Sequence, residues 1–166
     1  MSEAAPLRDR PTVRVLLFDP DGRLLLMKGR LPSAPDGPAA WFTVGGGAEP
    51  GETVLEAAIR EVREETGFTE VAFGPVIWRR EGPLALAGGE VVMFREHYIV
   101  ARCAGGEPSR DGWEELERQL VDDLRWWSLD DLRALEDRVY PGGLADRLPG
   151  VLAGAHPPEP VTIPWD

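Results

Sequence analysis

A glycine-rich turn leading into an acidic amphipathic segment, residues 46–68, constrains this chain more than any other stretch. Thr53 and Glu56 have the spacing of a capping box, in which two side chains satisfy free N–H groups at a helix start. Apolar residues then recur at the three- and four-residue intervals of a helix that buries one face. The pattern predicts a helix that packs through Leu55, Ala58, Ile59 and Val62.

Three glutamates of this helix, Glu61, Glu64 and Glu65, are three and four residues apart. At this spacing their side chains project from the same face of the helix. Like charges so close together oppose helix formation, and a divalent cation relieves the repulsion. Mg²⁺ takes oxygen ligands and is often held by a few carboxylates together with substrate phosphates. The spacing therefore indicates a metal site that takes a phosphorylated substrate.

The same stretch resembles the Nudix box, whose pattern is G-x5-E-x7-R-E-U-x-E-E-x-G-U with U a bulky aliphatic or aromatic residue. Every fixed position is filled, by Gly46, Glu52, Arg60, Glu61, Val62, Glu64, Glu65, Gly67 and Phe68. The alternative, an ordinary acidic surface helix, does not explain the glycine turn and the acid spacing together. The resemblance implies the Nudix fold, an α/β/α sandwich with a mixed β-sheet.

The resemblance also implies roles for single residues. Arg60 is expected to orient Glu61 or Glu64, because its guanidinium presents a planar fork of donors to carboxylates. Glu52 either assists metal or water positioning or is an acid placed favourably at a helix N-terminus. Glu61 or another nearby acid is expected to accept the proton of the attacking water. The expected ligands of Mg²⁺ or Mn²⁺ are the backbone carbonyl of Gly45 and the carboxylates of Glu61, Glu64 and Glu65.

A further acid from outside the box often completes such sites, and Glu96 is the first candidate. It interrupts a strand face on which Val92, Phe94, Tyr98 and Val100 alternate. The alternative for Glu96 is an outward charge on an edge strand. Other candidates on expected loops or short helices are Glu90, Glu114, Glu115 and Glu117.

Substrate contacts are less clearly marked. Trp41 and Trp78 are the tryptophans expected to line the cleft, whereas Trp126 and Trp127 lie on a predicted strand typical of core. Basic or aromatic residues expected to touch base or phosphate are Phe18, Lys28 and Arg30.

The expected function is Mg²⁺-dependent hydrolysis of a diphosphate linkage in a nucleoside diphosphate derivative. Nucleotide sugars and ADP-ribose-like compounds rank ahead of a modified nucleoside triphosphate, on the loop at 31–40 and on Pro83, whose spacing from the box resembles that of ADP-ribose pyrophosphatases. One alternative is a non-catalytic Nudix domain that senses a ligand. Another, an isoprenoid diphosphate isomerase, needs a cysteine in the cleft, and Cys103 is poorly placed for it.

Composition limits the partners and the setting. The 166 residues suit one domain, and a net charge of −11 argues against a nucleic-acid duplex or an anionic membrane surface as partner. The N-terminus has no apolar targeting segment, and no stretch reaches the length of a membrane span. A cytoplasmic enzyme is the simplest expectation. Homodimers are common in the family, so a homodimer is one expected assembly.

Turn residues and periodicity predict the remaining elements. Asp19–Gly22 reads as the turn of a hairpin between its two flanking strands. The chain should begin with a loose lead-in over 1–11 and end with an extended Pro-rich tail over 156–166. Strands are expected at 13–18, 24–28, 41–44, 71–80, 91–104 and 124–128, a loop at 81–89, and helices at 113–120, 129–136 and 144–152.

Overall fold

In a computed structural model that describes residues 5–31 and 33–165, strands and helices alternate along the chain. The strands are β1 (Asp9–Phe18), β2 (Leu24–Gly29), β3 (Ala40–Gly47), β4 (Val71–Ala85), β5 (Val91–Cys103), β6 (Val121–Trp127), β7 (Val139–Tyr140) and β8 (Val161–Thr162). The helices are α1 (Val54–Thr66), α2 (Glu115–Leu120), α3 (Leu129–Ala134) and α4 (Leu144–Leu152).

The strands form one mixed sheet in the order β6-β2-β3-β1-β5-β4-β8, with β7 beside β3. The pairs β1–β5, β3–β7 and β4–β8 are parallel, and the other pairs are antiparallel. A mixed sheet with helices is the predicted fold class, which is confirmed.

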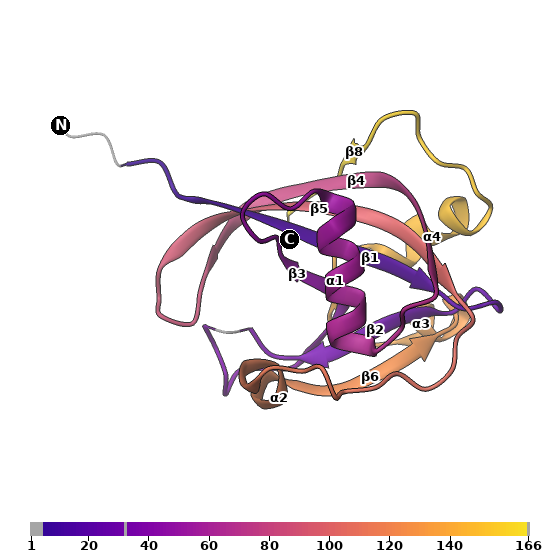
Figure 1. Cartoon of the computed structure of the whole chain (residues 1–166), viewed down its shortest axis with the longest axis horizontal. Helices are drawn as coiled ribbons and strands as arrows, with labels where there is room; N and C mark the ends of the chain where they lie inside the picture. The colour runs from indigo at the N-terminus through magenta and orange to yellow at the C-terminus, as the bar shows by residue number, and fades with distance from the viewer. Residues whose placement is uncertain (1–4, 32, 166) are drawn as a thin grey trace.

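Helices cover both faces of this sheet (Figure 1). One hydrophobic cluster joins Ala57, Ala58 and Val62 of α1 to one face of β1. The other cluster joins Leu132 of α3 and Leu148 of α4 to the opposite face. The layers are those of an α/β/α sandwich. Among the described residues, no helix is long and apolar enough to cross a membrane.

Helix α1 begins with the predicted capping box of Thr53 and Glu56, whose reciprocal hydrogen bonds are both 3.1 Å. The predicted buried face is wrong in part, because Leu55 and Ile59 are 47% and 45% exposed. The helix is rotated so that Glu61 and Glu65 face inward together with its small apolar residues. A helical period shows which residues share a face of a helix, but it does not show which face packs against the sheet. In α1 the packed face includes Glu61 and Glu65, which a hydrophobic pattern treats as polar and solvent-facing.

Several element boundaries differ from the prediction. The lead-in is shorter than 1–11, because β1 begins at Asp9 and pairs in parallel with β5. The predicted hairpin of β1 and β2 pairs only at Phe18 and Leu24, since β3 lies between the two strands over the rest of their length. The predicted loop over 81–89 is largely strand, because β4 continues to Ala85.

Near the C-terminus, α4 has the predicted bounds and α3 starts after its predicted N-cap, Ser128. The tail is not simply extended. Its short strand β8 pairs with β4, and Ile163 is buried in the core.

Candidate active site

A close backbone approach brings the glycine turn against helix α1. The amide of Gly45 donates a 2.9 Å hydrogen bond to Glu65 Oε2. Gly45 has a φ of +142°, and a side chain there would overlap the carbonyl oxygen of Val13 on the neighbouring strand. A Cβ on Gly46 would lie 2.7 Å from Glu61 Oε1. Only glycines let this turn pass so close to both acids.

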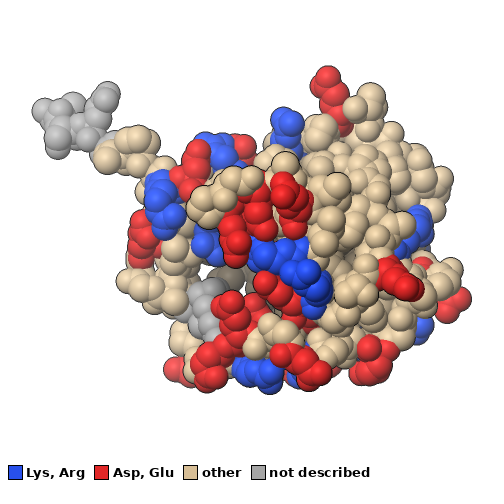
Figure 2. Space-filling model, in the orientation of Figure 1, with Lys and Arg blue, Asp and Glu red and all other residues tan. Residues whose placement is uncertain are grey.

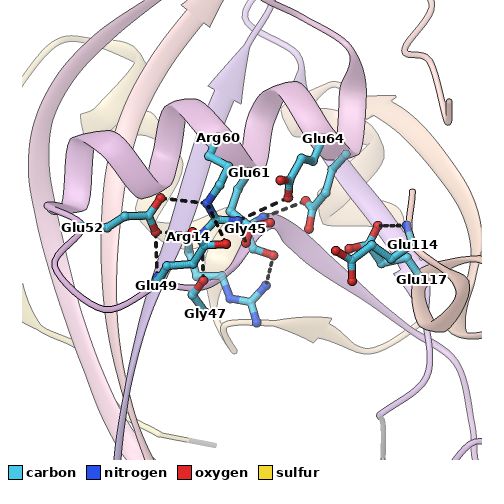
Figure 3. Close-up of polar contacts among 11 residues, drawn as sticks. Arg14, Gly45, Gly47, Glu49, Glu52, Arg60, Glu61, Glu64, Glu114 and Glu117 are labelled. Atoms are coloured by element: carbon cyan, nitrogen blue, oxygen red, sulfur yellow. Dashed lines mark hydrogen bonds and ion pairs between the residues drawn. The ribbon is translucent and has the colours of Figure 1, made fainter. Parts of the chain in front are cut away.

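Arg60 ties the box together (Figure 3). Its guanidinium donates to both carboxylate oxygens of Glu52 at 2.7 and 2.8 Å, and to the carbonyl of Gly47 at 3.0 Å. Nη1 donates to Glu61 at 3.1 Å and to Glu64 at 3.2 Å. The predicted contacts of Arg60 with Glu61 and Glu64 are therefore both present. The carboxylate of Glu52 pairs with Arg60 and accepts from the amide of Glu49. The hydrogen bond from Arg60, followed by that from Glu49, lowers the pKa of Glu52 to about 2.

Glu61 and Glu65 are buried carboxylates, 6% and 4% exposed. Burial raises the pKa of Glu61, and burial followed by the neighbouring charge of Glu61 raises the pKa of Glu65 well above its usual range. Two buried acids that resist ionising together form a place where a cation is favoured.

The residues present fit a divalent cation in part. The buried pair Glu61 and Glu65 lies beside the turn at Gly45 and Gly46. The Gly45 carbonyl oxygen accepts from Arg14 Nη1 at 3.4 Å, and a carbonyl has a second lone pair for a cation. Glu64 shares Arg60 Nη1 with Glu61 and has a side chain 35% exposed. The described residues hold no preassembled group of three acid, histidine or cysteine side chains. Since Mg²⁺ often uses one or two carboxylates together with substrate phosphates, the two acids and the carbonyl suffice for this mode. Glu64, held by the same guanidinium nitrogen as Glu61, stays a predicted ligand.

A cavity of about 320 Å³ opens beside these acids. Its wall includes Gly45 and Glu65 together with four arginines, Arg10, Arg14, Arg30 and Arg80. Figure 2 shows acidic side chains crowded around a hollow on the face of the molecule that carries α1. The cavity thus combines acidic and basic side chains, as a metal-bound phosphate ester requires.

Glu96 lies in this cavity and is only 4% exposed, so the alternative of an outward edge charge is wrong. Its Oε2 accepts from Arg14 Nε at 3.1 Å, and its Oε1 lies 3.0 Å from Arg80 Nε and accepts from the Tyr98 hydroxyl at 3.1 Å. Both carboxylate oxygens are engaged by donors. In this arrangement Glu96 pairs with Arg14 and Arg80, and its role as a metal ligand stays a prediction.

Helix α2 supplies a further acid near the box. Glu117 lines the cavity, and burial raises its pKa, with smaller contributions from Glu61, Glu114 and Glu64. Figure 3 shows Glu114 and Glu117 opposite the end of α1 that carries Glu64. Of the candidates outside the box, Glu117 therefore lies on the cavity wall and near enough to Glu61 and Glu64 to feel their charges. Glu90 is exposed and pairs with Arg8 at 2.9 Å.

Two predicted substrate contacts differ from the structure. Trp41 and Trp78 are 3% and 6% exposed, belong to the core cluster on the α3–α4 side, and do not line the cavity. Strand alternation gives two faces but not which of them borders the cavity, so the prediction placed these rings on the wrong surface. Trp127 is core as predicted, and Phe18 is also core.

The two predicted basic contacts separate. Lys28 lies outside the cavity lining, 3.7 Å from Asp137 and over the ring of Trp41. Arg30 does line the cavity and pairs with Asp122 at 3.0 Å. Arg30 is thus the predicted substrate residue that the fold brings to the site.

Residues that the sequence did not reveal complete the cavity. Arg14 and Arg80 meet Glu96 across three neighbouring strands, 82 and 16 positions apart in the chain. Tyr140 of β7 stacks on Phe42 with ring centres 5.3 Å apart. The sequence signal for the arginines is the position of Glu96 on an apolar strand face, because a buried carboxylate needs countercharges on adjacent strands.

Comparison with known proteins decides the family. The model described as NUDIX domain matches residues 8–146 of this chain. The chain belongs to the Nudix family. It is 34% identical over 147 residues to an RNA pyrophosphohydrolase of Caulobacter vibrioides. The match covers 79% of this chain and 78% of the relative.

Solved structures share this Nudix fold. The MutT protein from Methanosarcina mazei Go1 has a TM-score of 0.64 at 19% identity, over 92% of this chain and 98% of the other. The E. coli dihydroneopterin triphosphate pyrophosphohydrolase has a TM-score of 0.64 at 18% identity, over 90% and 99% of the two chains. The predicted family and its hydrolase class are confirmed. Nudix hydrolases generally use divalent metal ions.

Proposed function

We propose that this Nudix hydrolase uses Mg²⁺ or Mn²⁺ to split a diphosphate linkage in a nucleoside diphosphate derivative. The observation that carries the proposal is the buried pair Glu61 and Glu65 beside Gly45, on the wall of a cavity that also contains arginines. A cation at the acids and guanidinium groups opposite them neutralise the charge that repels a nucleophile from a diphosphate.

Each site residue has a part in this proposal. Glu61 and Glu65, with the carbonyl of Gly45, hold the metal, which when bound supplies charge neutralisation and a more acidic water. Arg60 fixes the carboxylate of Glu61 through its 3.1 Å contact and keeps Glu64 within reach of the same site. Glu61 accepts the proton of the attacking water, and Glu64 is the alternative acceptor because it is more exposed.

Two substrate classes are in view. Nucleotide sugars, ADP-ribose-like compounds and modified nucleoside triphosphates follow from the family resemblance. Pro83, which favoured ADP-ribose, lies exposed on strand β4 and does not line the cavity. A 5′-polyphosphorylated RNA end is the second candidate, favoured by the 34% identity to a protein named RNA pyrophosphohydrolase.

A release assay tests the proposal. Purified protein with Mg²⁺ or Mn²⁺ is incubated with ADP-ribose, UDP-glucose, GTP, 8-oxo-dGTP and a short 5′-triphosphorylated RNA, and the products are resolved by chromatography. We expect metal-dependent cleavage between phosphorus atoms of at least one compound and its abolition by EDTA. Folded protein that binds these compounds without turning any over contradicts the proposal and favours the ligand-sensing alternative.

A further inference from the structure

The segment that follows the matched family domain reaches back into the cavity. The family match ends at residue 146, and β8 lies beyond it. Ile163 is 2% exposed, and its amide donates to the carbonyl of Arg79 at 2.8 Å. Because the chain is fixed to β4 at Ile163, Trp165 two residues later lies in the cavity wall.

Trp165 packs on three residues there. Its ring lies 4.3 Å from the guanidinium carbon of Arg80 and 6.1 Å from the ring of Phe94. Gly82 lies directly beneath it, because a Cβ on Gly82 would overlap the indole. The indole of Trp165 can therefore pack here only because Gly82 has no side chain.

Arg80 is held from several sides. Its guanidinium carbon lies 4.3 Å from the ring centre of Trp165 and 5.9 Å from that of Tyr140. Its Nε lies 3.0 Å from Glu96 Oε1, an ion pair without hydrogen-bond alignment. Nη1 is buried and has no hydrogen-bond partner among the residues that the structure describes.

The guanidinium of Arg80 has more buried donors than acceptors among the described residues. Arg14 and Arg80 share the single carboxylate of Glu96, and the nearby Arg10 also lines the cavity. A buried guanidinium with an unsatisfied donor is costly unless an anion completes it. The buried Nη1 of Arg80 is therefore a donor that an oxygen of a substrate anion can complete.

We propose that Arg80 binds a phosphate group of the substrate, and that Trp165 is the positioning residue that holds its guanidinium toward the cavity. The arrangement fits a phosphate because a guanidinium donates two parallel hydrogen bonds to phosphate oxygens. The inference deepens the proposed function: the substrate carries a phosphate beyond the one at Glu61 and Glu65.

The two phosphate positions are linked through the structure. Arg14 Nη1 donates to the carbonyl oxygen of Gly45 at 3.4 Å, and the amide of Gly45 contacts Glu65. The Nε of Arg14 reaches Glu96, which contacts Arg80. Arg14 and Glu96 thus span the interval from the expected metal site to Arg80, along which a polyphosphate chain lies.

Binding of inorganic tripolyphosphate in EDTA tests this without requiring turnover or metal. Calorimetry should show binding to the wild-type protein and at least about tenfold weaker binding to Arg80→Gln, the usual effect of losing a charged hydrogen bond. Trp165→Ala should weaken binding by roughly 3- to 30-fold, the range of a cation–π contact. Trp165→Phe should restore it to within about twofold, and Pro164→Ala, a change at the neighbouring exposed residue, should leave it unchanged.

Gly82→Ala provides an independent arm, because it displaces the indole without touching Arg80. Its loss of affinity should equal that of Trp165→Ala, and the double variant should be no weaker than either single one. For any substrate that is turned over, Trp165→Ala should raise KM more than it lowers kcat, since Trp165 touches no reacting atom.

Absence of tripolyphosphate binding to the wild type overturns the inference, as does unchanged affinity in folded Trp165→Ala. If Arg80→Gln does not fold, the Trp165 and Gly82 variants decide alone. Should the protein bind tripolyphosphate in this pattern yet hydrolyse none of the nucleotides, the proposed function fails while the phosphate site stands. If nucleotides are hydrolysed but the Arg80, Trp165 and Gly82 variants bind tripolyphosphate as the wild type does, the phosphate site fails while the proposed function stands.

Discussion

Glu65→Gln is expected to lower kcat at least about a hundredfold while leaving the fold intact. Glutamine removes one negative charge from the expected metal site, where electrostatic stabilisation of the transition state is worth about two to three orders of magnitude. The glutamine side-chain oxygen still accepts the hydrogen bond that the Gly45 amide now donates to Glu65. Since burial and Glu61 already raise the pKa of Glu65, a neutral side chain suits this position without metal.

Steady-state rates with a confirmed substrate, together with melting temperatures, check this expectation. Glu90→Gln is the matched control, because Glu90 is an exposed acid at the tip of the β4–β5 hairpin and pairs only with Arg8 among the described residues. Its kcat should stay within about twofold of wild type. A Glu65→Gln enzyme with wild-type turnover would refute the assignment of Glu65 to the metal site.

Gly45→Ala is expected to destabilise the protein by about 3–5 kcal/mol. The added methyl overlaps the carbonyl oxygen of Val13, and alanine is strained at a φ of +142°. Neither strand can shift cheaply, because β1 and β3 pair through this position. Denaturant unfolding with a matched m-value measures the change.

Two other glycines separate the causes. Gly51 also has a positive φ, +82°, but a Cβ there would meet no atom of the described residues within 4 Å, so Gly51→Ala should cost only about 1–2 kcal/mol. At Gly88 an added Cβ meets no close neighbour among the described residues, and φ is not positive. Gly88→Ala should therefore be nearly neutral. If Gly45→Ala is no worse than Gly51→Ala, the close contact between the two strands is not what the geometry indicates.

Local signals predicted the parts of this protein that local rules govern. The capping box of Thr53 and Glu56, the N-cap Ser128 and helix 144–152 depend on neighbours within a few positions, and the structure has them as expected. The alternation around Glu96 also held, because strand periodicity is local.

Long-range features could not be predicted in this way. The meeting of Arg14, Glu96 and Arg80 depends on the register of three strands, which no local pattern reports. The seat of Trp165 depends on a glycine 83 positions earlier in the chain. Trp41 and Trp78 were placed in the cleft because aromatic type alone does not tell a core ring from a cavity ring.

The same limit explains the face of α1. Leu55 and Ile59 follow the helical period, yet they are exposed, since the buried face is shared with the site acids Glu61 and Glu65. Burial of those acids is a cost to folding that a purely hydrophobic pattern does not anticipate. Functional sites are where such local expectations are known to fail.

Electron paramagnetic resonance of Mn²⁺ tests the central claim most directly, because the signal of free Mn²⁺ falls as the ion binds. Wild-type protein with α,β-methylene-ADP should bind Mn²⁺, and Glu90→Gln should bind it equally. The double variant Glu61→Gln, Glu65→Gln should lose this binding while remaining folded. Equal Mn²⁺ binding by the double variant, or none by the wild type with the analogue present, would contradict the claim that these two acids hold the metal.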